Sequence, residues 1–173
     1  MPMTLVQTAV LVFAGAACVI DLRDGRIPNL LTFGAIVVAF VVHGFLPQGE
    51  GLAHVGFGML VGLAMFFPFF ALGGMGAGDV KLMAAIGAWL GPMLAVLTAL
   101  YGAVAGGVLA LGLALSKGYL KTALSNLRRM IWHWRVHGLE PVPELTLEHN
   151  RGPRLAYALP IFIGLLVTLW RTA

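Results

Sequence analysis

The sequence contains little charge, one cysteine and only two serines. Charged residues make up 10% of its 173 residues and hydrophobic residues 60%, whereas soluble domains carry about 25% charged residues. So small a charged fraction excludes a soluble enzyme, a disordered tail and a nucleic-acid-binding module. The single cysteine, Cys18, can form no disulfide within the chain and no multi-cysteine metal site. The composition is instead typical of a helical membrane protein.

Long apolar blocks predict an all-α, polytopic membrane protein of about six transmembrane helices, in one domain over 1–173. We expect the first block to be a retained helix and not a signal peptide, because no Lys or Arg precedes it. The block 80–115 is too long for one span, and we expect it to break at Gly91-Pro92. The predicted spans are 4–20, 30–46, 52–72, one ending near residue 90, 93–115 and 155–170.

The segment before the fourth span, residues 73–79, is too rich in glycine to form a stable helix by itself. The apolar piece that follows it, 80–90, would cover only about 16 Å, which is roughly half of the hydrocarbon thickness of a bilayer. Either the helix begins earlier than the glycines indicate, or the glycine segment dips into the membrane. In both cases we expect Asp79 to lie below the membrane surface.

The positions of Lys and Arg predict the orientation of the chain. With six spans, all but one of the 11 basic residues fall on one side of the membrane, the exception being Arg171. That side is expected to be the cytoplasm, with both chain ends outside. The predicted location is therefore the inner (cytoplasmic) membrane, with residues 116–154 as a cytoplasmic segment.

Part of that cytoplasmic segment is predicted to form a basic amphipathic helix. Over 117–135, leucine, isoleucine and tryptophan recur at helical spacing, and the basic residues fall largely on other faces. This pattern is typical of a helix on an anionic membrane surface, with membrane lipid as its partner. The alternative is a helix docked on the protein's own loops. Pro141 and Pro143 are expected to end it, before a solvated acidic stretch of Glu140, Glu144 and Glu148.

Few side chains could carry out catalysis. Ser116 and Ser125 both lie in the basic segment, away from the interior of any span, and Cys18 has no histidine close to it in the sequence. His133 and His137 have metal-binding spacing, but no acidic residue lies between them, so we expect two histidines on a polar helix face. No metal and no cofactor is therefore predicted, and carboxylates remain.

The chain has three aspartates, Asp21, Asp24 and Asp79, and all lie in predicted cytoplasmic connections. Ionisable residues at a membrane are costly and often functional. Two carboxyls that share one proton can hydrolyse a peptide, because one activates water while the other stays protonated. Two alternatives stay open at this point: ion pairs of Asp21 and Asp24 with Arg23 and Arg26, and a proton- or ion-coupled transporter that uses the same carboxylates.

Two motifs in this sequence resemble those of the type IV prepilin leader peptidases. Gly76-Ala77-Gly78-Asp79, followed by Val80-Lys81, is similar to the family's Gly-x-Gly-Asp signature. The stretch that begins at Asp21 and ends in Ile27-Pro28-Asn29 resembles the family's other motif. Tyr157-Ala-Leu-Pro160 is similar to a weaker family element.

The resemblance implies that Asp21 and Asp79 form a catalytic dyad, supported by Gly76, Gly78, Lys81, Pro28 and Asn29. It implies an aspartic endopeptidase that removes the short basic leader of prepilin-like precursors, just after a glycine and next to the apolar pilin helix. The chain has no paired Cys-x-x-Cys motifs, so we expect the minimal form found with Flp/Tad-type pili, without N-methyltransferase activity. The related archaeal preflagellin peptidase, a small transporter and a non-catalytic assembly scaffold remain as alternatives.

Overall fold

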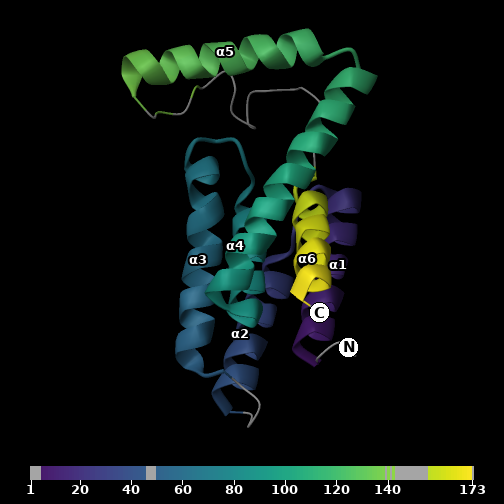
Figure 1. The fold of residues 1–173 in the computed structure, drawn as a ribbon, viewed down its shortest axis with the longest axis vertical. Helices are drawn as coiled ribbons and strands as arrows, with labels where there is room; N and C mark the ends of the chain where they lie inside the picture. Colours follow the sequence, from purple (N-terminus) through teal and green to yellow (C-terminus); the bar gives the residue numbers. More distant parts are fainter. Residues whose placement is uncertain (1–4, 46–49, 139, 141, 143–155, 173) are drawn as a thin grey trace.

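The computed structural model describes residues 5–45, 50–138, 140, 142 and 156–172, and of His137 only the backbone. All regular structure in these residues is α-helical (Figure 1), which confirms the predicted fold class. The helices are α1 (Leu5–Asp24), α2 (Asn29–Phe45), α3 (Leu52–Ala71), α4 (Ala77–Ser116), α5 (Leu120–His137) and α6 (Ala158–Thr172).

Five of the helices form a bundle, and α5 lies across one end of it (Figure 1). Helix α4 is the centre of the bundle, because it packs against α3, α6, α2 and α1. Both ends of the chain lie away from α5, whereas the α1–α2 link and the α3–α4 loop lie at the end nearer to α5. The predicted basic connections are thus at one end of the molecule.

Close packing in the bundle depends on glycines that face backbone. A Cβ atom added at Gly58 of α3 would collide with the carbonyl of Gly87 in α4, and one at Gly62 with that of Met83. Gly164 of α6 meets Thr98 and Gly102 of α4 in the same way. Small residues let helix backbones approach this closely, which is how helices associate where no water drives them together.

The predicted break at Gly91-Pro92 is present inside α4. Gly91 has φ 78° and ψ 177°, a region of backbone space that essentially only glycine occupies. The ring of His54 fills the position that a Cβ atom at Gly91 would take. Helix α4 therefore consists of two helical parts on either side of this residue.

The predicted end of the first span was wrong, and the start of the fourth span, which was left open, is observed. Helix α1 continues four residues past residue 20 and ends at Asp24, where Gly25 adopts a φ of 64° and closes the last turn through a bond from its N–H to the Asp21 carbonyl. Helix α4 begins at Ala77, so residues 77–79 are helical and not loop. Of the two alternatives for the glycine segment, the earlier helix start is the one observed.

Three helices, α1, α3 and α4, are long and apolar enough to cross a membrane, and the apolar α2 and α6 are shorter. The predicted basic amphipathic segment is a helix, α5. Several residues of the predictions lie outside the described part of the chain: Pro47, Gln48 and Gly49, which connect the predicted second and third spans, and Pro141, Pro143, Glu144, Glu148, Arg151 and Arg154.

Candidate active site

Asp21 belongs to the buried face of α1. It continues a stripe formed by Val10, Ala14, Ala17 and Cys18, and it is only 8% exposed. Its Oδ2 accepts a hydrogen bond of 3.4 Å from the N–H of Ala158, the first residue of α6. The N-terminus of a helix carries partial positive charge, so α6 stabilises a carboxylate at this position.

Asp79 lies in the first turn of α4, and it is also 8% exposed. Its N–H donates to the carbonyl of Gly76 over 3.2 Å. A Cβ atom at Gly76 would lie 3.2 Å from the Asp79 carboxylate oxygen, which is tighter than ordinary contact. Glycine at this position therefore leaves room for the carboxylate.

The structure brings these two aspartates together from separate helices. Each carboxylate is close enough to the other for their charges to interact. Two buried carboxyls of like charge are unfavourable when both are ionised, and such a pair holds one proton more readily than none. This arrangement can supply a general base and a general acid side by side.

The remaining residues of the two motifs also contact each other. A Cβ atom at Gly78 would lie 3.2 Å from the Cβ of the buried Ile27, so Gly78 permits close packing of the α1–α2 link on α4. The Lys81 ammonium donates to Asn29 Oδ1 over 2.9 Å and lies 5.5 Å from the centre of the Phe33 ring. These contacts join the start of α2 to the start of α4.

Pro28 precedes α2 directly, and its carbonyl accepts the first hydrogen bonds of that helix, from Leu31 and Thr32. The two sequence motifs are thus parts of one site. All seven residues that the sequence singled out lie in it or at its edge.

Tyr157 is a site residue that sequence reasoning treated only as part of a weak motif. Burial, and then the charge of Asp79, raise the pKa of its phenol above the ordinary value. The hydroxyl therefore stays protonated at neutral pH and is able to donate a hydrogen bond near the aspartates. The Ala158 N–H was missed altogether, because a backbone donor leaves no trace in the sequence.

Asp24 differs from the other two aspartates. It is the last residue of α1, beyond the predicted end of the first span, and its side chain is exposed. The alternative interpretation required an ion pair of Asp24 with Arg23 or Arg26. Among the described residues no such ion pair is present. Asp24 lines a hollow of about 450 Å³, together with the polar Arg26 and Asn29 and the apolar Ile20, Ile27 and Pro28.

Of the other nucleophiles, the two serines lie away from this site, whereas Cys18 is next to Asp21. The hydroxyls of Ser116 and Ser125 are exposed and donate to carbonyls of their own helices, those of Leu113 and Thr122. Cys18 is buried one turn before Asp21. Within the described ranges, no group of three His, Cys, Asp or Glu side chains could hold a metal ion.

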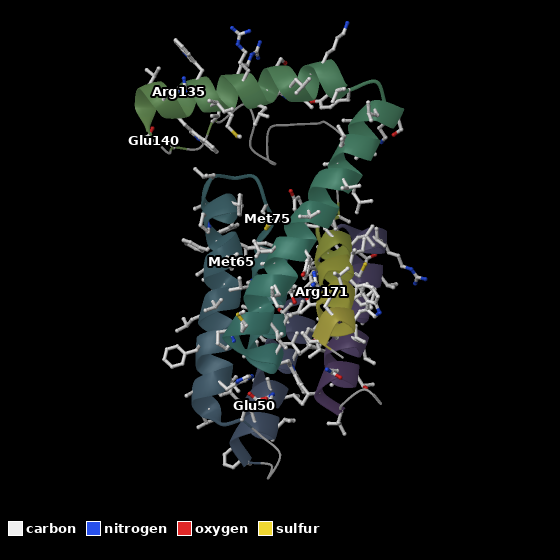
Figure 2. All side chains as sticks on the ribbon, in the orientation of Figure 1. Glu50, Met65, Met75, Arg135, Glu140 and Arg171 are labelled. Carbon is white, nitrogen blue, oxygen red and sulfur yellow. The ribbon has the colours of Figure 1, made fainter. Side chains whose placement is uncertain are left out.

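A second polar cluster, which the sequence analysis did not anticipate, lies at the opposite end of the bundle. His54 Nδ1 and Glu50 Oε2 are 2.8 Å apart, and the N–H of Glu50 donates to His43 Nδ1 over 3.3 Å. The rings of His43 and His54 stack with centroids 5.3 Å apart. Figure 2 shows Glu50 at this far end, and Met75 of the glycine loop toward the aspartate end.

Comparison with known proteins gives one family. The model of the type IV leader peptidase family matches residues 8–111, a range that contains both buried aspartates. Proteins named "Prepilin leader peptidase/N-methyltransferase" from Aeromonas salmonicida (strain A449) and Aeromonas hydrophila are each 35% identical to the chain over 97 residues. These matches cover 50% of the chain but only 33% of each relative. No solved structure matches the chain.

Proposed function

Since this chain belongs to the type IV leader peptidase family, we propose that it is a membrane-embedded aspartic endopeptidase that removes the leader from prepilin-like precursors. The observation that carries the proposal is the pair Asp21 and Asp79, two buried carboxyls that interact electrostatically at one end of the bundle. The relatives, which the chain matches over a third of their length, carry the name prepilin leader peptidase/N-methyltransferase. Their name supports this class of substrate.

In the proposed reaction, the ionised member of the pair takes a proton from a water molecule as the water oxygen attacks the scissile carbonyl carbon. The protonated member gives its proton to the carbonyl oxygen, and a neutral tetrahedral intermediate results. Collapse of this intermediate breaks the C–N bond. The leaving nitrogen takes up the proton that the base had removed, and one hydroxyl of the intermediate returns its proton to the other carboxylate, which restores the pair. Atoms and charges balance without a metal ion or a covalent intermediate.

Asp21 is suited to be the ionised member, because the N–H of Ala158 donates to its carboxylate. Asp79 is suited to hold the proton, since its carboxyl is buried and its neighbour is an anion. The Tyr157 phenol lies near this pair as a neutral donor, which suits it to hold a substrate carbonyl.

For the membrane, we propose six crossings: α1, α2, α3, the two parts of α4 on either side of Gly91, and α6. The aspartates then face the cytoplasm at the inner membrane, because the described basic residues other than Arg171 gather at that end. Helix α5 has no acidic residue and exposes Leu124, Leu127 and Ile131 beside Lys121 and Arg128. These features support binding of α5 to anionic lipid.

We propose further that the precursors are pilins of Flp/Tad type, with a short basic leader, a glycine and then an apolar helix. The test is cleavage of one such precursor by the purified chain in phospholipid vesicles, followed by mass spectrometry of the products. The expected result is a single cut directly after the glycine. The positive control is a related peptidase that cleaves the same precursor. A precursor that this control cuts and this chain leaves intact would refute the proposal.

A further inference from the structure

The outer surface of the bundle has an apolar groove between α1 and α2, which contact each other little over their lengths. The groove has a volume of about 480 Å³, and every residue that lines it is apolar. Its walls include the small residues Ala9, Gly34 and Ala35. Small residues on a membrane-facing helix allow another helix to come close.

Aromatic side chains form a fixed floor for this groove. The indole N–H of Trp89 donates to the carbonyl of Ala35 over 2.8 Å, and Trp89 is only 4% exposed. The Phe13 ring lies beside it, with centroids 6.4 Å apart. The floor is therefore held by α4 and α1, and the groove does not depend on a mobile side chain.

Gly34 shows that the groove is open. A Cβ atom added at Gly34 would meet no other atom within 4 Å, although the residue lies on the groove wall and not on a free outer face. By contrast, neighbouring backbone occupies the space where a Cβ atom at Gly58 or Gly87 would lie. The space in front of Gly34 is thus large enough for a side chain from another molecule.

The groove begins at the level of the aspartates. Pro28 lines its upper end, and the adjacent Ile27 packs on Gly78, the residue before Asp79. Trp89 lies ten residues after Asp79 in the same helical part of α4, which places the floor about 15 Å deeper. An apolar helix of about ten residues would span this depth.

Polarity changes along the same path. Pro28 also lines the hollow that contains Asp24, Arg26 and Asn29, together with Ile20 and Ile27. A chain that lay in both would meet charged and polar side chains in the hollow and apolar ones alone in the groove. This order matches a precursor that enters from the aqueous side and continues into the membrane.

We propose that the groove between α1 and α2 binds the first turns of the apolar helix that follows the cleavage point of the precursor. The proposal rests on the proposed function and adds the surface that selects the substrate. Gly34 is then a specificity residue, and it has no part in the chemistry.

The test compares two glycines that differ only in location. Gly34→Leu would fill the groove, while Gly56→Leu places the same side chain on α3, where an added Cβ also meets nothing within 4 Å. Each variant is assayed in vesicles with two synthetic substrates, one with leader, glycine and 20 apolar residues, the other cut short after the first few. For Gly34→Leu we expect a KM about tenfold higher for the long substrate and unchanged kinetics for the short one.

Gly56→Leu is expected to behave as the wild type with both substrates. Val38→Trp, at an exposed position on the same groove wall, gives a second chance to fill the groove if Gly34→Leu does not fold. A photoreactive amino acid at position 34 should crosslink to the apolar part of the long substrate, whereas one at position 56 should not.

Equal kinetics of all variants on the long substrate would overturn the groove proposal while leaving the peptidase intact. Crosslinks from position 34 to lipid alone, or to a second copy of this chain, with the added long substrate unlabelled, would overturn it as well. Failure of the wild type to cut either substrate would instead count against the proposed function. The two failures are therefore distinguishable.

Discussion

At one end of the bundle Asp21 and Asp79 bury two carboxyls of like charge, whereas at the other end Glu50 pairs with His54. The histidine end contains groups of complementary charge and hydrogen-bonding character, although Nε2 of the buried His43 has no partner there. The aspartate end has two acids, and the described hydrogen bonds to their side chains come from backbone, at Ala158 and Gly76.

This difference indicates which of the two polar clusters is catalytic. A set of opposite charges can stabilise a fold or at least repay its own desolvation. Two like charges in a low dielectric cannot, so their retention needs another reason, and a shared proton is such a reason. The presence of buried polar residues alone would have indicated a catalytic site at both ends of the bundle.

The largest expected effect is on the chemistry of the aspartate end. Asp21→Asn and Asp79→Asn should each reduce cleavage about a thousandfold or more, because asparagine can neither share a proton nor act as a base. Asp24→Asn is the matched control, since its exposed side chain lies outside the pair, and it should keep substantial activity. Cleavage is measured with a precursor in membranes, after insertion of each variant has been checked.

The pattern can fail in two informative ways. Full activity of Asp79→Asn would remove the peptidase assignment. Loss in Asp24→Asn with activity kept in Asp21→Asn would mean that the wrong aspartate of the first motif had been chosen.

The next effect concerns the fold at the histidine end. Gly91→Ala should lower the free energy of unfolding by about 1–3 kcal/mol or more, because alanine is strained at this backbone conformation and its methyl would meet the His54 ring. Gly107→Ala is the control within α4, where an added Cβ meets nothing. Denaturation in detergent gives the free energies, and equal values for both variants would contradict the role given to Gly91.

A smaller effect is expected from the contact between the two motifs. Lys81→Met removes the bond to Asn29 and should lower kcat/KM about tenfold, by loosening the position of the α1–α2 link beside Asp79. Asn29→Ala should have the same effect, and the double variant should be no worse than either single one. Strictly additive losses would show that the two residues act independently.

The smallest effect should come from Glu50→Gln. Glu50 is largely exposed, and exposed ion pairs contribute only about 0–1 kcal/mol. The variant should therefore unfold almost as the wild type does and cleave at the same rate. A loss of cleavage would end the distinction between a structural and a chemical end of the bundle.

Much of the fold follows from the sequence for simple physical reasons. Apolar blocks must be helical in a membrane, because every backbone polar group needs a partner within its own segment. The break in the long block was predictable since Pro92 lacks an N–H and Gly91 tolerates unusual backbone angles. Helix ends were less predictable: Asp24 is polar yet helical, and the end of α1 depends on Gly25.

The site was predictable as a pair of motifs but not as a geometry. The sequence placed Asp21 and Asp79 at helix ends on one side, and the family resemblance joined them. The donor at Ala158 depends on how α6 packs against α1, and the bond between Lys81 and Asn29 depends on the angle between α2 and α4. Such contacts are set by tertiary packing, so no local pattern reveals them.

The histidine cluster escaped for a related reason. His43 and His54 sit singly in apolar blocks on two sides of a turn, and their stacking becomes visible only in three dimensions. A search that counted histidines with the acids and bases would have found His43 and His54 on either side of Glu50.

The most direct test of the central claim, that the aspartate pair is kept for chemistry and not for stability, is the thermal unfolding of Asp79→Asn beside its cleavage activity. The amide removes one acid from a buried pair of like charge and keeps its shape, so relief of repulsion should offset the loss of any contact. We predict an unfolding midpoint equal to or higher than that of the wild type, with cleavage abolished. A clearly lower midpoint, or cleavage that persists, would contradict the account, because Asp79 would then be a structural residue.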